Sequence, residues 1–288
     1  MNKKDFLLIL LLATVLLGIY LLGKSQIFPE NLKGVTPEKI ASRFPVVTPT
    51  PSPTSRPLTF AEMNTLYGPC VNLPTLMYHH VQDSKSAEEK NQTSLTVTPE
   101  YFKKQMQYLK DNGYKTVYMS DLMNFFDGMG EVPKKSVLIT FDDGYDDFAT
   151  DAIPILREFS FTTTVFLPTG LMDNPEYLTW NTIRDLAKAG DVVFANHTWS
   201  HRNVAANKIE VEREIRTGDA QLDEKGFNSP KLFAYPYGLE SEFAEELLDS
   251  LGYKLAFTTR SGSTLCKKQR LDLPRIRVGN TSLATYGF

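Results

Sequence analysis

The chain has 288 residues, a formal net charge of −3, 42% apolar residues and 11% aromatic residues. This length and apolar content are enough for one large domain with a substantial core, together with further segments. No long block of Lys and Arg is present, which argues against a nucleic-acid partner, because such partners need a clustered basic surface.

The N-terminus carries an apolar segment of its own. Lys3 and Lys4 precede the 18-residue uncharged run FLLILLLATVLLGIYLLG at 6–23, and Lys24 closes it. The run reaches the lower length limit of a membrane-spanning helix, and its positive side is expected to stay in the cytoplasm. A cleaved signal peptide is the alternative, although its apolar region is normally about 7–15 residues long and a small-residue cleavage site follows it. We therefore expect an anchor at 1–24 and an extracellular domain at the cell membrane.

A linker is predicted over 25–70. Residues 46–58, VVTPTPSPTSRPL, hold four prolines among Thr and Ser, a composition that buries no core and stays extended. The folded domain is then expected at 71–288. The two cysteines, Cys70 and Cys266, are too few for a disulfide scaffold and lack the CxxC spacing of a metal site. A single bridge between them is left open, because the sequence does not give their separation.

From residue 73 onward, apolar strands alternate with helices. The expected strands are 73–78, 115–118, 136–141, 161–167, 191–195, 231–235 and 255–258. The expected helices are 98–112, one that begins at Ser120, and 150–159, 179–189, 209–225 and 240–251. This order predicts an α/β fold with a parallel sheet or a βα-barrel. In such barrels the chemistry gathers where the strands end.

All four histidines of the chain fall at predicted strand ends. His79 and His80 lie in LMYHHV after the first strand, and His197 and His201 lie in FANHTWSH after a later one. Two imidazoles four residues apart, with an aspartate from another strand end, make a site with two nitrogen ligands and one carboxylate. Such a site leaves positions for water and substrate, as a catalytic Zn²⁺ site requires.

The aspartates come from LITFDDGYDD at 138–147, directly after a β-branched apolar run. An EF-hand calcium loop does not fit, because its D-x-[DN]-x-[DN]-G spacing is missing. Asp146 and Asp147 are expected to cap the next helix, where negative charge is favourable. That leaves Asp142 and Asp143 as the carboxylates available for chemistry.

TFDDG at 140–144, HTWSH at 197–201 and FAYPYG at 233–238 resemble, in this order, the motifs of the polysaccharide deacetylase family, also called the NodB-homology or carbohydrate esterase 4 family. The resemblance covers roughly residues 73–278. It implies a distorted (β/α)7 barrel and the removal of acetyl groups from N-acetylglucosamine polymers or from xylan, with a bound divalent metal.

The chain departs from the family pattern in two places. No histidine follows His201, whereas many members carry the catalytic acid in a C-terminal Leu-x-His motif. LMYHHV resembles instead a circularly rearranged branch that includes deacetylases of poly-N-acetylglucosamine, and the pattern of that branch selects His79. The third motif has Ala234 in the place of the arginine that steadies the catalytic base. Arg275 or Arg277, in LPRIRV, is the substitute that we consider.

Amide hydrolysis then assigns the roles. The expected metal ligands, most simply of Zn²⁺, are Asp143, His197 and His201. The metal would activate a water molecule and polarise the carbonyl. Asp142 would accept the proton of the water, and His79 would give one to the leaving nitrogen. The backbone N–H of Tyr237 is expected to help hold the oxyanion.

Trp180, Trp199 and Tyr145 are candidates for sugar binding, since an aromatic ring can cover the apolar face of a sugar; ordinary packing is the alternative for each. The rival functions are a non-catalytic carbohydrate-binding module, an acetyl-esterase on a xylan-like polymer and a metal-dependent peptidase. The expected partners are a polysaccharide and the membrane. The sequence decides neither the polymer nor the oligomeric state.

Overall fold

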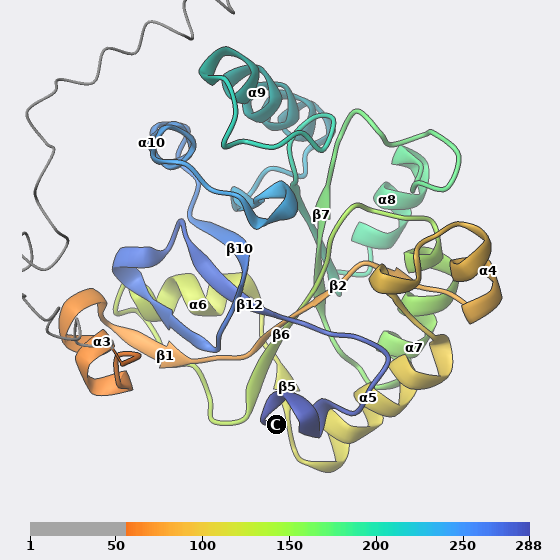
Figure 1. Cartoon of the computed structure of the whole chain (residues 1–288), viewed down its shortest axis with the longest axis horizontal. Helices are drawn as coiled ribbons and strands as arrows, with labels where there is room; N and C mark the ends of the chain where they lie inside the picture. The colour runs from red at the N-terminus through yellow and green to blue at the C-terminus, as the bar shows by residue number, and fades with distance from the viewer. Residues whose placement is uncertain (1–55) are drawn as a thin grey trace, which may run out of the picture. The chain divides into compact units, whose positions relative to one another are not determined.

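The structure is a computed structural model, and it describes residues 56–288. In these residues, parallel strands form a closed ring. Within these residues the ring has the order β2-β12-β10-β9-β8-β7-β6, and β6 pairs back onto β2. Strand β5 adds to β6 outside the ring. Figure 1 shows helices α5, α7, α8, α9 and α10 around the outside of these strands. The predicted α/β fold with a seven-stranded βα-barrel is therefore confirmed.

The strands of the described residues are β1 Cys70–Asn72, β2 Thr75–Tyr78, β3 His80–Val81, β4 Thr96–Val97, β5 Lys115–Thr116, β6 Ser136–Phe141, β7 Thr163–Leu167, β8 Val192–Asn196, β9 Leu232–Ala234, β10 Leu255–Ser261, β11 Thr264–Cys266 and β12 Leu273–Arg277. The α-helices are α3 Phe60–Tyr67, α4 Ser84–Glu89, α5 Pro99–Asp111, α6 Met119–Phe126, α7 Ile153–Glu158, α8 Trp180–Ala187, α9 Lys208–Lys225 and α10 Glu242–Ser250.

Strand β6 shows how the barrel directs side chains toward the site. All six of its residues are buried, as expected of a parallel strand covered on both faces. Side chains alternate along a strand. Leu138 belongs to the cluster that the ring strands share, whereas Val137 and Ile139 pack in the cluster that includes the outer helices. By the same alternation, Asp142 follows Leu138 on the inner face, at the carboxyl end of the barrel.

The folded part begins earlier than the expected boundary at residue 71. Its compact unit starts at Pro57, and helix α3 occupies part of the segment that we assigned to the linker. Thr59 caps this helix, and the Glu62 carboxylate accepts a hydrogen bond from the N–H of Thr59. Strand β1 then pairs antiparallel with β11, and a disulfide joins Cys70 to Cys266. The linker expected at 25–70 therefore does not reach residue 70, because residues from Pro57 onward belong to the folded unit.

Other local differences follow from contacts that the sequence does not show. A π-helical turn, Phe148–Ala152, precedes α7 and brings the chain to Pro154. Helix α6 begins at Met119, where the Asp121 carboxylate accepts from the Tyr118 N–H, and not at Ser120. Between residues 56 and 288 no helix combines the length and apolarity needed to span a membrane. The expected anchor at 1–24 lies outside the described residues.

Candidate metal and catalytic site

Two strand ends and one loop bring the expected metal ligands together. Asp143 follows β6, and His197 follows β8, with β7 between the two strands. The Nε2 atoms of His197 and His201 lie 3.4 and 3.1 Å from Asp143 Oδ1. One ligand atom from each of the three residues falls within 4.8 Å of the others. Asp143 and His197 are buried, and His201 is partly exposed.

The hydrogen bonding of these residues fits a cation. His197 Nδ1 lies 2.7 Å from the carbonyl oxygen of Ala234. A carbonyl only accepts, so Nδ1 carries the proton and the Nε2 lone pair of the neutral ring faces Asp143. Asp143 Oδ1 is buried and has no hydrogen-bond partner. Electron-pair donors that converge without a proton between them are the arrangement that a metal ion satisfies.

Backbone strain is concentrated at this site. Asp143, Thr198, His201 and Tyr237 all have positive φ, at 72°, 69°, 59° and 61°. Each such residue costs of order 1–3 kcal/mol, and it persists where the surroundings fix the conformation. The chain therefore holds both ligand-bearing turns and the 236–238 turn in conformations that ordinary loops avoid.

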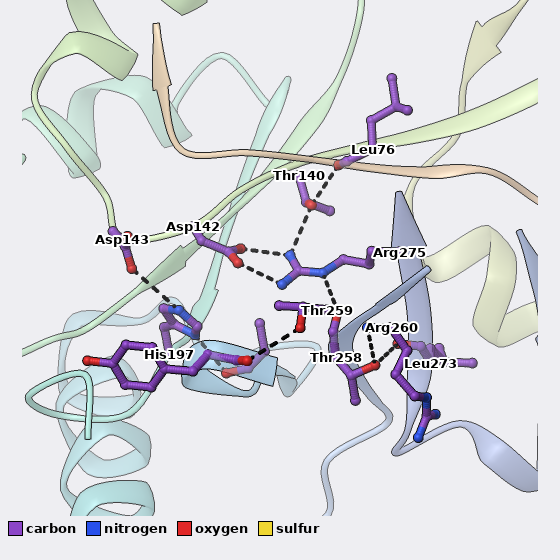
Figure 2. A network of polar contacts seen from close by, with 12 residues as sticks. Leu76, Thr140, Asp142, Asp143, His197, Thr258, Thr259, Arg260, Leu273 and Arg275 are labelled. Atoms are coloured by element: carbon purple, nitrogen blue, oxygen red, sulfur yellow. Dashed lines mark hydrogen bonds and ion pairs between the residues drawn. The ribbon is translucent and has the colours of Figure 1, made fainter. Parts of the chain in front are cut away.

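Arg275 is the partner of Asp142. Its Nη1 and Nη2 donate to Asp142 Oδ1 and Oδ2 at 2.7 and 2.6 Å, as Figure 2 shows. Its Nε donates to the carbonyl of Thr258, and Nη1 also donates to Thr140 Oγ1. Arg275 is fully buried. Arg277 instead donates to the carbonyl of Ser94 and is exposed, so the structure brings only one of the two candidate arginines to Asp142.

The surrounding charges keep both carboxylates ionised. Burial raises the pKa of Asp142, but the Arg275 guanidinium outweighs it, with smaller contributions from His197 and His79, and the pKa lies below its usual value. Burial likewise raises the pKa of Asp143, and the contacts with His197 and His201 hold it well below the usual value. Two adjacent carboxylates are thus both charged near neutral pH, Asp142 because of the Arg275 guanidinium and Asp143 because of its contacts with the two histidines.

The adjacent histidines have different environments. His79 is half-buried, and burial lowers its pKa, although the nearby Asp142 and Asp143 charges oppose that shift. His80 is buried, and its Nδ1 forms a short contact with the Asp147 carboxylate. Asp147 also accepts from the Val81 N–H and makes no capping hydrogen bond. The expectation that Asp147 caps the next helix was therefore wrong, because the carboxylate turns to the residues that follow His79.

The structure separates the expected sugar-binding aromatics. The Tyr145 ring stacks on His80 at 3.6 Å, so one of its faces is covered. Trp199 packs over Gly170, where a Cβ would come within 2.2 Å of its Nε1, and Arg213 lies over the ring. Trp180 packs against the outer core, under the Lys225 ammonium. These contacts favour packing for the two tryptophans.

Tyr237 and Tyr177 are two further aromatic residues near the expected metal ligands that keep exposed surface. The Tyr237 ring lies 4.7 Å from the His201 ring and is 63% exposed. Tyr177 packs 5.3 Å from Tyr145, and burial and the Asp143 charge raise its pKa. No local sequence pattern selects Tyr177, because its approach to the site depends on an isolated β-bridge between it and Tyr145.

Sequence reasoning missed other residues of the site because their hydrogen-bond partners lie far away in the chain. Thr140 donates to the Leu76 carbonyl while it accepts from Arg275, and the Thr258 carbonyl accepts from the same arginine. Thr140 lies in β6 and Thr258 in β10, and both residues are buried. A hydroxyl in a buried strand was the available signal, since a buried hydroxyl needs a hydrogen-bond partner.

Comparisons with known proteins agree with this geometry. The family model described as polysaccharide deacetylase matches residues 129–256. A solved structure of the Streptococcus pyogenes deacetylase PplD in complex with acetate is 30% identical, with a TM-score of 0.67, over 74% of this chain and 95% of that one. The chain belongs to the polysaccharide deacetylase family.

Two curated relatives extend the comparison. The poly-beta-1,6-N-acetyl-D-glucosamine N-deacetylase of Escherichia coli K12 is 29% identical over 71% of this chain, which spans 36% of the length of that relative. The putative polysaccharide deacetylase YxkH of Bacillus subtilis is 27% identical over 72% of this chain and 71% of its own length. This chain therefore corresponds to only about a third of the Escherichia coli relative.

Proposed function

We propose that this chain is a metal-dependent hydrolase that removes N-acetyl groups from an N-acetylglucosamine-containing polysaccharide. The observation that carries the proposal is the arrangement of Asp143, His197 and His201 beside an Asp142 that is paired with a buried arginine. The named activities of the Streptococcus and Escherichia coli relatives support the same reaction class.

The residues present divide the work of amide hydrolysis. A divalent cation held by Asp143, His197 and His201, most simply Zn²⁺, would supply an activated water and a polarised acetyl carbonyl. Asp142 accepts a proton from that water. The bidentate contact with Arg275 keeps the Asp142 carboxylate ionised and fixed in orientation.

His79 is the group that returns a proton to the departing amine. It lies near both aspartates, whose charges oppose the lowering of its pKa by burial, and an imidazole can hold and release a proton near neutrality. The backbone N–H of Tyr237 contributes to holding the oxyanion, on a turn whose conformation the chain keeps under strain. The exposed Tyr237 ring provides an apolar surface next to His201 on which a sugar ring can lie.

We further propose that the domain works outside the cytoplasm, on a membrane anchor at 6–23. The Cys70–Cys266 disulfide supports an oxidising compartment. Protease added to intact cells should release an active fragment cut within 46–58. A mature N-terminus found in the medium just after residue 24 would instead identify a cleaved signal peptide.

The activity is tested on three polymers. The Zn²⁺-loaded protein is incubated with poly-N-acetylglucosamine, peptidoglycan and acetylated xylan, and acetate release and the acetyl content of the polymer are measured by mass spectrometry. Loss of N-acetyl groups from a glucosamine polymer is the expected result. Release from xylan alone would identify an esterase, and no release from any polymer would favour a non-catalytic module.

Two variants separate the carboxylates in the same assay. Asp142→Asn should abolish turnover and leave metal content near normal, because only proton acceptance is removed. Asp143→Asn should lose the metal itself. Equal loss of metal in both variants, or an active Asp142→Asn, would show that the roles are assigned wrongly.

A further inference from the structure

Each residue between the two histidine ligands forms a hydrogen bond that holds the loop in place. The Asn196 side-chain oxygen accepts from the Thr198 N–H at 2.7 Å. The Trp199 carbonyl accepts from the Gly170 N–H at 2.7 Å. Ser200, directly before His201, is held by a different element. Its N–H and its hydroxyl donate to Glu214 Oε2 and Oε1 at 2.7 and 2.8 Å.

Glu214 is an unusual residue for its place in helix α9. It lies on the buried stripe of the helix with Val211, Ile215, Gly218 and Leu222, and its side chain has no exposed surface. A buried carboxylate is costly to desolvate unless hydrogen bonds or a close counter-charge compensate it. The cation nearest to it among its ion pairs is Arg213, whose Nη2 is 3.9 Å away on a side chain that is 59% exposed. The two bonds from Ser200 are therefore its principal compensation.

The consequence of this clamp reaches His201. His201 has a φ of +59°, a conformation that a non-glycine residue keeps only when its neighbours fix it. This pair of hydrogen bonds fixes the Trp199–Ser200 peptide unit and the Ser200 side chain, immediately before His201. It thus sets the direction from which the imidazole approaches Asp143 Oδ1, at 3.1 Å.

We propose that Glu214 is a positioning residue for the metal site: it holds Ser200 and thereby presets His201 as a ligand, without touching the metal. This inference rests on the proposed function, because it presupposes that His201 binds a metal. The groups that orient a ligand typically affect metal affinity about 10–100-fold.

The test measures metal affinity, and not only activity, in the full-length protein. Apparent dissociation constants for Zn²⁺ and Co²⁺ are obtained by chelator competition at fixed pH, and the visible absorption of bound Co²⁺ reports ligand geometry. Glu214→Ala should weaken binding about 10–100-fold and change the Co²⁺ spectrum. Glu214→Gln should stay close to wild type, because an amide can still accept from the Ser200 N–H and donate to its hydroxyl.

Two further variants complete the design. Ser200→Ala removes only the hydroxyl bond and leaves α9 intact, so it should weaken binding toward the lower end of that range, about 10-fold. Glu212→Gln is the control, because Glu212 lies on the same helix but pairs with Arg216 on the exposed side. Its affinity and spectrum should match the wild type.

The outcomes distinguish the two proposals. If the wild-type protein binds neither metal, the metal site and the proposed function fail together. If the wild type binds but Glu214→Ala keeps its affinity and spectrum, only the positioning role is overturned. Equal weakening in Glu214→Gln and Glu214→Ala would also overturn it, since charge and not the clamp would then be responsible. Should Glu214→Ala fail to fold, a Ser200→Ala variant with unchanged metal affinity and Co²⁺ spectrum would overturn the positioning role.

Discussion

Arg275 and Asp142 form a fully buried ion pair that joins residues far apart in the chain. The pair links the carboxyl end of β6 to strand β12, so the position of the Asp142 side chain depends on β12. Because a bidentate guanidinium satisfies both carboxylate oxygens, Asp142 has a fixed orientation and a lowered pKa. Both properties are what a proton acceptor beside a metal site needs.

Replacing Arg275 by Met should affect both stability and pH dependence. Leaving Asp142 buried and unpaired is expected to cost about 3–5 kcal/mol of unfolding free energy. The folded-state pKa of Asp142 is lowered at present, so its ionised form contributes stability above the unfolded pKa, and that contribution is lost as pH falls through the folded pKa. In Arg275→Met burial dominates and the pKa rises, so the acidic limb of kcat/KM should move to higher pH.

The matched control is Arg277→Met. Arg277 is exposed, and in the described residues its hydrogen bond goes to the Ser94 carbonyl. Chemical denaturation and pH–rate profiles of both variants provide the measurement. An unchanged acidic limb in Arg275→Met would contradict the assignment of Asp142 as the base that this arginine holds ionised.

The two adjacent histidines should respond differently to truncation. His79→Ala is expected to lower turnover about 10²–10⁴-fold with metal content kept, as for loss of a general acid. Because neighbouring side chains of a strand point to opposite sides, a site that uses His79 leaves His80 to pack or to meet solvent, and replacement of such a residue is ordinarily mild. The buried pairing with Asp147 changes that expectation, because His80→Ala would leave a buried carboxylate without its histidine.

We therefore expect His80→Ala to lose stability, with a reduced melting temperature, and His79→Ala to keep it. Turnover per folded molecule, metal content and thermal melting are measured for each variant. A catalytic defect confined to His80→Ala would reverse the assignment of the acid.

The choice between Arg275 and Arg277 shows where residue-scale prediction stopped. Two residues apart in a strand, both side chains share a face, so the pattern LPRIRV treats them alike. Their difference comes from the register of β12, in which Ile276 pairs with Leu76 and which sets Arg275 within the barrel and Arg277 nearer its rim. The HxxxH spacing, in contrast, is local, and it selects His197 and His201, whose side chains the structure brings beside Asp143.

At the scale of elements, buried β-branched runs predicted the strands well, and β6 matches 136–141 at both ends. Strand β12 was missed because Pro274 and two arginines are untypical of a central strand. The charge of its buried Arg275 is balanced by the carboxylate of Asp142, directly after β6. The π-helical turn at Phe148–Ala152 was not predictable either, since no local pattern distinguishes it from the start of an ordinary helix.

Helix α9 packs closely against the histidine loop at Gly218, and for this position we predict a stability change of opposite sign to helix propensity. Alanine in a helix interior normally gains about 1 kcal/mol over glycine. A Cβ at Gly218 would lie 2.6 Å from Asn196 Oδ1 and 3.1 Å from the Thr198 backbone. Overpacking of this kind costs about 1–3 kcal/mol, so Gly218→Ala should be less stable and should weaken metal binding.

Gly130→Ala serves as the comparison, because a Cβ there meets only Asn124 Cβ, at an ordinary 3.7 Å. Thermal melting and Zn²⁺ affinity are measured for both variants. A stabilised Gly218→Ala with normal affinity would mean that the loop accommodates the methyl group without displacement of its ligands.

For the whole molecule, the disulfide between β1 and β11 links residues 196 positions apart. Closing so long a loop restricts the unfolded chain, and removing such a bond typically costs about 2–5 kcal/mol. Cys70→Ser/Cys266→Ser should therefore show a lower unfolding free energy under non-reducing conditions, with metal affinity retained. The same comparison under reducing conditions should bring the wild type toward the variant, and wild-type stability that ignores reductant would contradict this role.

The same bond makes a macrocycle of residues 70–266. His79, both aspartates and both ligand histidines lie within it, and Arg275 lies on the short tail beyond. A protease that makes one cut in a surface loop inside the macrocycle leaves every one of these groups on a single covalent molecule. A cut before Cys70 removes the preceding segment and leaves the macrocycle closed. In surroundings rich in proteases, the protein should therefore lose its N-terminal segment long before cleavage separates the residues of the site from one another.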